Sequence, residues 1–77
     1  MEQEKMNVQV KLNEIEKVKD FVSTVAKYPF DIDIKSGRFT IDAKSIMGIF
    51  ALDLSKPVTV ISREYDARLV EELKAFM

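Results

Sequence analysis

Four segments of the chain alternate hydrophobic with polar residues, and each of them predicts a strand. Alternation with a period of two places one side of a strand on a core and leaves the other side in water. The pattern is longest at the start of the chain, where Met6, Val8, Val10 and Leu12 are separated by polar residues. The four predicted strands cover residues 6–12, 30–35, 38–41 and 58–61.

The second and third predicted strands form a hairpin. They flank Ser36-Gly37, a dipeptide that favours a tight turn. One register brings all their apolar side chains to a single face of the sheet. That register pairs Lys35 with Arg38, Ile34 with Phe39 and Ile32 with Ile41.

Three other segments repeat apolar residues at helical spacing. The first predicted helix runs to about Lys27, with Asn13 and Glu16 as a capping box at its start and Pro29 beyond its end. Its apolar stripe comprises Ile15, Val18, Val22 and Val25, with Phe21 beside them. The second helix begins after the N-cap residue Ser45 and ends near Leu52. The third begins after Asp66, and its stripe comprises Leu69, Val70, Leu73, Phe76 and Met77.

The elements therefore follow the order βαββαβα. Every strand with a clear pattern has one polar face, so we expect the helices to pack on the other face of one antiparallel sheet. The periodicity predicts an α+β two-layer sandwich. With 77 residues and no linker or repeat, residues 1–77 make one domain.

The second helix carries more apolar side chains than one face can bury. At about 100° per residue, Ile49 and Leu52 point one way, while Ile46, Met47 and Phe50 point roughly the opposite way. Only one of these stripes can face the sheet. We predict that Ile46, Met47 and Phe50 form an exposed partner-binding surface, and the alternative is that they extend the core.

Composition excludes several classes of function. The chain has no histidine and no cysteine, which excludes phosphohistidine chemistry, imidazole catalysis, disulfides and His- or Cys-ligated metals. Twelve basic and thirteen acidic residues without a basic block argue against direct contact with nucleic acid. Asp31, Asp33 and Asp42 could meet on one sheet face, but solvation explains them more simply than a metal. We predict no cofactor and no metal.

The location of the protein is also an expectation from sequence. Residues 1–5 do not resemble a signal peptide, and no apolar run approaches the ~20 residues of a membrane span. We therefore expect a cytoplasmic protein that does not bind membranes.

The segment Lys44-Ser45-Ile46-Met47-Gly48 resembles the regulatory serine segment of HPr, the phosphocarrier protein of the bacterial phosphotransferase system. Ala26-Lys27-Tyr28 and residues 31–34 and 58–60 also agree with that family. The similarity extends from about Val8 to Phe76. It implies an HPr-like open-faced sandwich, with a four-stranded antiparallel sheet and three helices on one face.

The resemblance also implies roles for individual residues. In the HPr family the serine caps a short helix and is phosphorylated by a dedicated kinase, which assigns regulatory phosphorylation to Ser45. The family's docking residues correspond to Ile46, Met47 and Phe50. An ungapped count back from Ser45 places Glu14 at the family's phosphorylated histidine and Glu16 at its arginine. The local charge now repels phosphate, so histidine-type phosphocarrier activity is not expected.

These inferences lead to one functional prediction with alternatives. The chain is predicted to be a non-enzymatic regulatory module of the carbon-catabolite control type, switched at Ser45. Its partners would be an HPr kinase/phosphorylase and a LacI-type catabolite regulator, with DNA contacted only by that regulator. One alternative is an atypical phosphocarrier that uses an acyl phosphate on Glu14. Another is an unphosphorylated interaction domain in which Ser45 is only a helix cap. A monomer or a weak dimer is expected.

Overall fold

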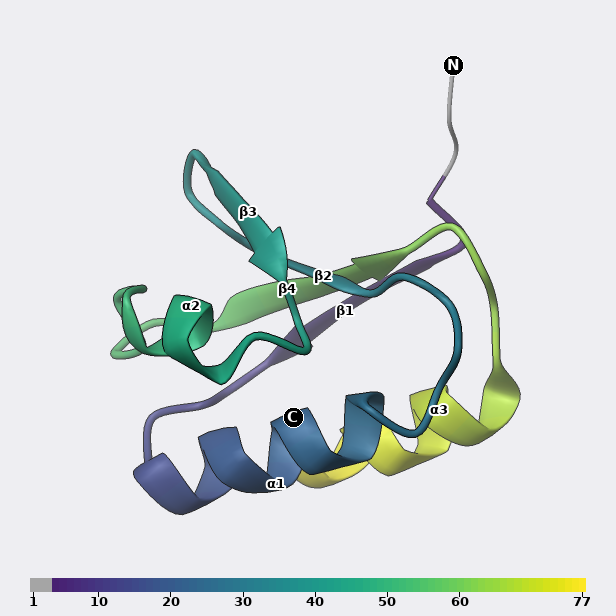
Figure 1. The fold of residues 1–77 in the computed structure, drawn as a ribbon, viewed down its shortest axis with the longest axis horizontal. Coiled ribbons are helices and arrows are strands. Elements are labelled where there is room, and N and C mark those ends of the chain that lie inside the picture. Colours follow the sequence, from purple (N-terminus) through teal and green to yellow (C-terminus); the bar gives the residue numbers. More distant parts are fainter. Residues whose placement is uncertain (1–3) are drawn as a thin grey trace.

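The structure is a computed structural model that describes residues 4–77. Its helices and strands follow the predicted order βαββαβα (Figure 1). The elements are β1 (Met6–Val10), α1 (Ile15–Val25), β2 (Asp33–Ser36), β3 (Phe39–Asp42), α2 (Ile46–Phe50), β4 (Val58–Ser62), α3 (Ala67–Leu73) and the short 3₁₀ segment η1 (Lys74–Phe76). The prediction about residues 1–5 falls partly outside the described residues. Between residues 4 and 77, no helix combines the length and the apolar character needed to cross a membrane.

The four strands form one antiparallel sheet in the order β1-β4-β2-β3. Helices α1 and α3 lie side by side against one face of the sheet, and α2 lies beside β3 at one end of the molecule (Figure 1). Because consecutive polar and apolar residues point to opposite faces of a strand, one face of the sheet is dry and the other is open to water. The predicted α+β open-faced sandwich is confirmed.

The core lies between the sheet and the two long helices. Phe21 of α1 and Phe76 of η1 pack edge to face, with ring centroids 5.7 Å apart. Burial of each large apolar side chain contributes about 1.5–3 kcal/mol, so these residues dominate the stability of the domain. The fully buried large side chains are Phe21, Leu12, Ile32, Ile34, Ile49, Leu69, Leu73, Val10, Val18, Val25, Val58 and Val60.

The start of α1 differs from the prediction. Glu14, and not Asn13, is the N-cap residue, and its side chain makes no capping hydrogen bond. Glu14 itself has an extended backbone, and the segment before it is fixed in place because Leu12 is buried and the Lys11 amide donates to the Phe76 carbonyl at 2.6 Å. The predicted capping box is therefore wrong.

The buried face of α1 also differs from the predicted stripe. Val18, Phe21 and Val25 are fully buried, so Phe21 lies at the centre of that face and not beside it. Ile15 is 62% exposed. It lies in the first turn, at the flank of the buried face, where no neighbouring element covers it.

The hairpin has its predicted faces but not its predicted register. The observed pairs are Asp33–Asp42, Ile34–Ile41, Lys35–Thr40 and Ser36–Phe39. The loop therefore consists of Gly37 and Arg38, and Gly37 supplies the positive φ of 58° that such a two-residue loop requires. The predicted register was wrong by two residues. A shift of two leaves every side chain on the same face, so the hydrophobic pattern cannot distinguish the two registers.

Candidate functional site

Ser45 lies exposed at the N-cap of α2, as predicted. Its Oγ accepts a hydrogen bond from the Gly48 amide at 3.2 Å, and its carbonyl accepts the first helical bond from the Ile49 amide at 3.1 Å. The predicted helix cap is confirmed. The hydroxyl group caps the helix from the solvent side, where it remains accessible to another protein.

The turn before α2 fixes the position of Ser45. The Lys44 amide donates to Asp42 Oδ1 at 2.8 Å, and the Ser45 amide donates to the Asp42 carbonyl at 3.0 Å. Asp42 is the last residue of β3, so this turn connects the edge of the sheet directly to the cap of α2. Ser45 is therefore held by the sheet and not by a loose loop.

Gly48 allows α2 to lie close to the sheet. A Cβ at this position would lie 3.2 Å from Ser45 Oγ and 3.3 Å from Ile41 Cδ1. Both distances are shorter than ordinary contacts between carbon and its neighbours. The glycine thus accommodates the capping hydroxyl on one side and a half-buried isoleucine of β3 on the other.

Helix α2 divides its apolar side chains much as predicted. Ile49 is fully buried, whereas Met47 is 78% and Phe50 43% exposed. Ile46 departs from the prediction, because it is only partly exposed and packs against the core. The surface available on α2 therefore consists mainly of Met47 and Phe50, and these two residues are the candidate docking surface, called the docking surface below.

The first turn of α1 lies at the same end of the molecule as α2 (Figure 1). Glu14, Ile15 and Glu16 are all exposed there. The only ion pair that involves these residues in the described part of the chain joins Glu16 to Lys19 at 4.0 Å, with both side chains largely in solvent. Such a pair contributes little, so the first turn of α1 presents two solvated carboxylates and one exposed isoleucine.

Lys44 precedes Ser45, but its ammonium group is engaged in another direction. Its Nζ donates to the carbonyls of Tyr28 at 2.6 Å and Phe30 at 3.0 Å. These bonds tie the loop between α1 and β2 to the turn before α2. The positive charge nearest to Ser45 in sequence therefore has a structural role.

The loop after α1 is also held to α3 through Glu72. The Tyr28 hydroxyl and the Lys27 ammonium both donate to this carboxylate, the latter at 2.6 Å. The bond from Lys27, followed by that from Tyr28, lowers the pKa of Glu72. Burial of the phenol, followed by the hydrogen bond to Glu72, raises the pKa of Tyr28 to about 12. This cluster joins the loop after α1 to α3, and none of its residues belongs to α2.

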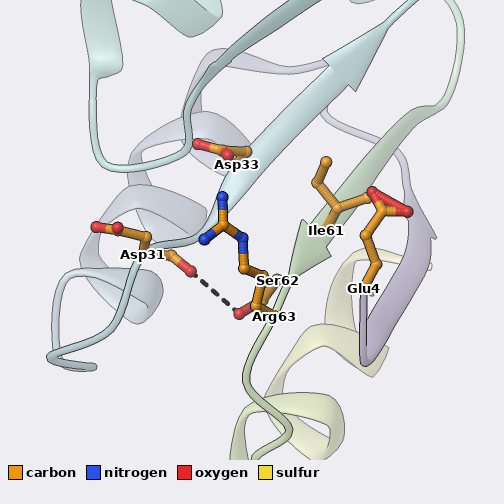
Figure 2. Close-up of a pocket in the computed structure, with 6 residues that line it drawn as sticks. All are labelled: Glu4, Asp31, Asp33, Ile61, Ser62 and Arg63. Carbon is orange, nitrogen blue, oxygen red and sulfur yellow. Dashed lines mark hydrogen bonds between the residues drawn. The ribbon is translucent and has the colours of Figure 1, made fainter. Parts of the chain in front are cut away.

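The carboxylates of the open sheet face line a shallow pocket with Arg63. Asp31 and Asp33 lie on one side of the pocket, and the Arg63 side chain points toward them (Figure 2). The Ser62 hydroxyl below them donates to the Asp31 carbonyl at 3.0 Å. Partial burial and then the charges of Asp42 and Asp31 raise the pKa of Asp33, while Arg63 acts in the opposite direction. Within residues 4–77, no three carboxylates converge on a metal-binding geometry.

Comparison with known proteins now places the chain in a family. The family model described as "PTS HPr component phosphorylation site" matches residues 14–77. This chain belongs to the HPr family. A phosphocarrier protein HPr from Bacillus anthracis str. Ames is 32% identical, with 90% of this chain and 89% of that chain covered and a TM-score of 0.67. The structure of HPr-C-His from Thermoanaerobacter tengcongensis has a TM-score of 0.71 at 23% identity, over 95% of this chain and 88% of that one, and shows likeness of fold. A comparison with curated protein sequences found no significant match.

Ile15 and Phe39 are exposed, although the hydrophobic pattern predicted buried positions for both. Ile15 was assigned to the buried stripe of α1, yet it lies exposed at the same end as the docking surface. Phe39 was assigned to the apolar face of the hairpin, yet it is 67% exposed beside the loop. Periodicity predicts the face of an element on which a residue lies, but it does not predict how far the neighbouring elements cover that face. Both residues lie beyond the covered part.

Proposed function

We propose that this HPr-family protein is a regulatory protein-binding module of the carbon-catabolite control type, and that phosphorylation of Ser45 switches its docking surface. The observation that supports this most directly is the adjacency of an exposed serine hydroxyl and two exposed apolar side chains on one short helix. Met47 follows Ser45 by two residues, so a group added to the hydroxyl changes the charge at the edge of the docking surface. The module acts in the cytoplasm and is not itself an enzyme.

A phosphate on Ser45 would change which partners the docking surface accepts. The ester oxygen can still accept the Gly48 amide, so the cap and the fold are preserved while up to two negative charges are added. Lys44 is held by the carbonyls of Tyr28 and Phe30, so this neighbouring charge is directed away from a phosphate at Ser45. The partner must then supply a cationic group beside an apolar pocket for Met47. A LacI-type catabolite regulator is the proposed partner, and it alone would contact DNA.

Carriage of a phosphoryl group is not part of the proposal. The chain has no histidine, and the ungapped count that aligns Ser45 places Glu14 at the family's histidine. Glu14 lies exposed at the N-cap of α1, with Glu16 in the first turn of the same helix. Because like charges repel, a second carboxylate does not stabilise an acyl phosphate.

Intact-mass spectrometry after incubation with ATP and an HPr kinase tests the modification. We expect one added phosphate on the wild-type chain and none on Ser45→Ala. Ser55→Ala is the matched control, because Ser55 is also exposed and its hydroxyl is likewise hydrogen-bonded, to Asp53 Oδ1 at 2.6 Å. Absence of added mass under conditions that modify an ordinary HPr would refute the switch and leave an unphosphorylated interaction domain.

A second measurement tests the loss of carrier activity. The chain is incubated with enzyme I and labelled phosphoenolpyruvate, and we expect no label. Hydroxylamine-sensitive label that disappears in Glu14→Gln would show an acyl phosphate and would overturn this part of the proposal.

Binding of the phosphorylated chain to a LacI-type regulator tests the docking surface. We expect Met47→Glu to weaken this binding by at least about tenfold, since truncation or charging of an interface anchor typically costs more than 1 kcal/mol. Met77→Glu is the control, because Met77 is 52% exposed at the far end of the chain. Equal binding by the two variants would show that α2 is not the docking surface.

A further inference from the structure

Strand β3 is an edge strand with an unpaired outer side. Along the described chain it pairs with β2 alone, and the β2–β3 hairpin projects from the end of the molecule (Figure 1). Arg38, Phe39, Thr40 and Asp42 are all exposed. An exposed edge strand with apolar side chains is a template for pairing with another strand.

The backbone of β3 presents hydrogen-bonding groups on this outer side. In an antiparallel ladder, pairs that exchange hydrogen bonds alternate with pairs that do not. Ser36 and Phe39 flank the two-residue loop and form a hydrogen-bonded pair. Four residues further along, the Ala43 amide donates to the Ile32 carbonyl at 2.9 Å, which is also a hydrogen-bonded position in this alternation. Thr40 lies between these bonded positions. Its N–H and C=O groups therefore point away from β2.

The segment of residues 38–42, which is β3 and the loop residue before it, is complementary to itself when it is run antiparallel about Thr40. In that register Thr40 lies opposite the Thr40 of a second copy, and the two residues can exchange both backbone hydrogen bonds. Phe39 lies opposite Ile41 on the helix-facing side. Arg38 lies opposite Asp42 on the open side. Both an apolar pair and an opposite-charge pair therefore occur twice across the two-fold axis.

The residues next to β3 on both faces of the sheet are compatible with this pairing. On the helix-facing side, a groove of about 390 Å³ lies between the hairpin and α2, and Ile41, Gly48 and Leu52 line it. The Phe39 of a second copy, placed opposite Ile41, would lie against this groove. On the open side, Asp42 is paired across the sheet with Asp33, and the two carboxylates repel each other. The incoming Arg38 would offset that repulsion.

From this complementarity we infer that the chain self-associates through β3, as a two-fold symmetric dimer with one continuous sheet across both copies. The occupant of the β3 edge is a second copy of this chain. The interface is separate from the docking surface of Met47 and Phe50, so it does not depend on the proposed function.

Sedimentation equilibrium at increasing concentration tests the dimer. The mass of the wild-type chain should rise from 8.9 kDa toward twice that value between micromolar and millimolar concentration. Thr40→Pro removes the outward N–H but no bond to β2, and proline is tolerated on an edge strand, so it should stay monomeric and folded. Thr40→Ala keeps the N–H and should dimerise like the wild type. A wild type that is monomeric throughout, or a Thr40→Pro variant that dimerises like the wild type, would overturn the inference.

A charge exchange tests the register and leaves every backbone N–H of the strand in place. Arg38→Glu alone places two like-charge pairs across the axis, and so does Asp42→Lys alone. Each variant should therefore associate at least about tenfold more weakly than the wild type. Mixed together they restore both opposite-charge pairs, so the mixture should form a heterodimer. A mixture that associates no better than its components would exclude this register. Circular dichroism confirms that each variant is folded.

Hydrogen exchange of the wild-type chain provides a readout that needs no variant. The Thr40 amide points to solvent in a single copy and is hydrogen-bonded in the proposed dimer. Its exchange should slow as concentration rises, whereas the amide of the buried Val60 should exchange at the same rate at every concentration. A Thr40 amide whose exchange is independent of concentration would contradict the inference.

Discussion

Gly48 offers a quantitative test of how α2 is built. A Cβ at this position would lie 3.2 Å from Ser45 Oγ and 3.3 Å from Ile41 Cδ1. Replacement of a helical glycine by alanine ordinarily gains about 1 kcal/mol. Here the hydroxyl would have to turn away, with loss of a cap worth about 1 kcal/mol, and the end of Ile41 would have to shift at a further cost of about 1 kcal/mol. We therefore expect Gly48→Ala to lower the free energy of unfolding by about 1 kcal/mol.

The same substitution should behave differently when the serine is absent. Ser45→Ala alone removes the cap and should lower the melting temperature by about 4–8 °C, which corresponds to about 1 kcal/mol in a domain of this size. In that background Gly48→Ala has no cap to disrupt, so its helical gain and the shift of Ile41 nearly cancel. The two substitutions should therefore couple by about 1 kcal/mol.

Urea unfolding of the wild type, both single variants and the double variant measures this coupling. Circular dichroism at 222 nm gives the fraction folded, and equal urea slopes show that the four proteins unfold between comparable states. A coupling energy below about 0.3 kcal/mol, within which independent sites are additive, would refute the contact between Ser45 Oγ and the Cβ position of residue 48.

Three further predictions concern α2, the Glu72 cluster and the open face of the sheet. Met47→Ala should change the free energy of unfolding by less than about 0.5 kcal/mol, whereas Ile49→Ala should lower it by about 2–5 kcal/mol, as measured by urea unfolding. Glu72→Gln should destabilise the chain at neutral pH. Because hydrogen bonds from Lys27 and then Tyr28 lower the folded-state pKa of Glu72, this difference in melting temperature should persist from neutral pH down to the ordinary pKa of 4.5 and be lost as the pH falls further, through the lowered folded-state pKa. Asp33→Asn should raise the free energy of unfolding at pH 7 by about 0.5 kcal/mol, because it removes a partly buried charge that also faces the like charge of Asp42. The folded-state pKa of Asp33 is raised, so this gain should shrink as the pH falls through that pKa toward 3.8. A gain independent of pH would contradict the charge argument.

The sequence alone determined the order of the helices and strands and excluded chemistry that needs a histidine. Alternation and helical spacing gave the order βαββαβα, and the N-caps at Ser45 and Asp66 follow from local rules, since a capping side chain bonds amides two or three residues away. The absence of histidine is likewise a property of the chain. The five residues from Lys44 to Gly48 were enough to indicate the HPr family.

Only the tertiary structure decided the relations between elements. The register of the β2–β3 hairpin could not be read from a pattern of period two, because a shift of two residues leaves every face unchanged. The N-cap of α1 is Glu14 and not the predicted Asn13. The segment before it is fixed by the hydrogen bond from Lys11 to Phe76, which is distant in sequence. Ile46 is partly buried because α2 packs against the core, a contact that its own sequence does not specify. The exposed edge of β3 depends on strand order, which is a property of the whole sheet. Local interactions fix the elements, and long-range packing fixes the surfaces that they leave exposed.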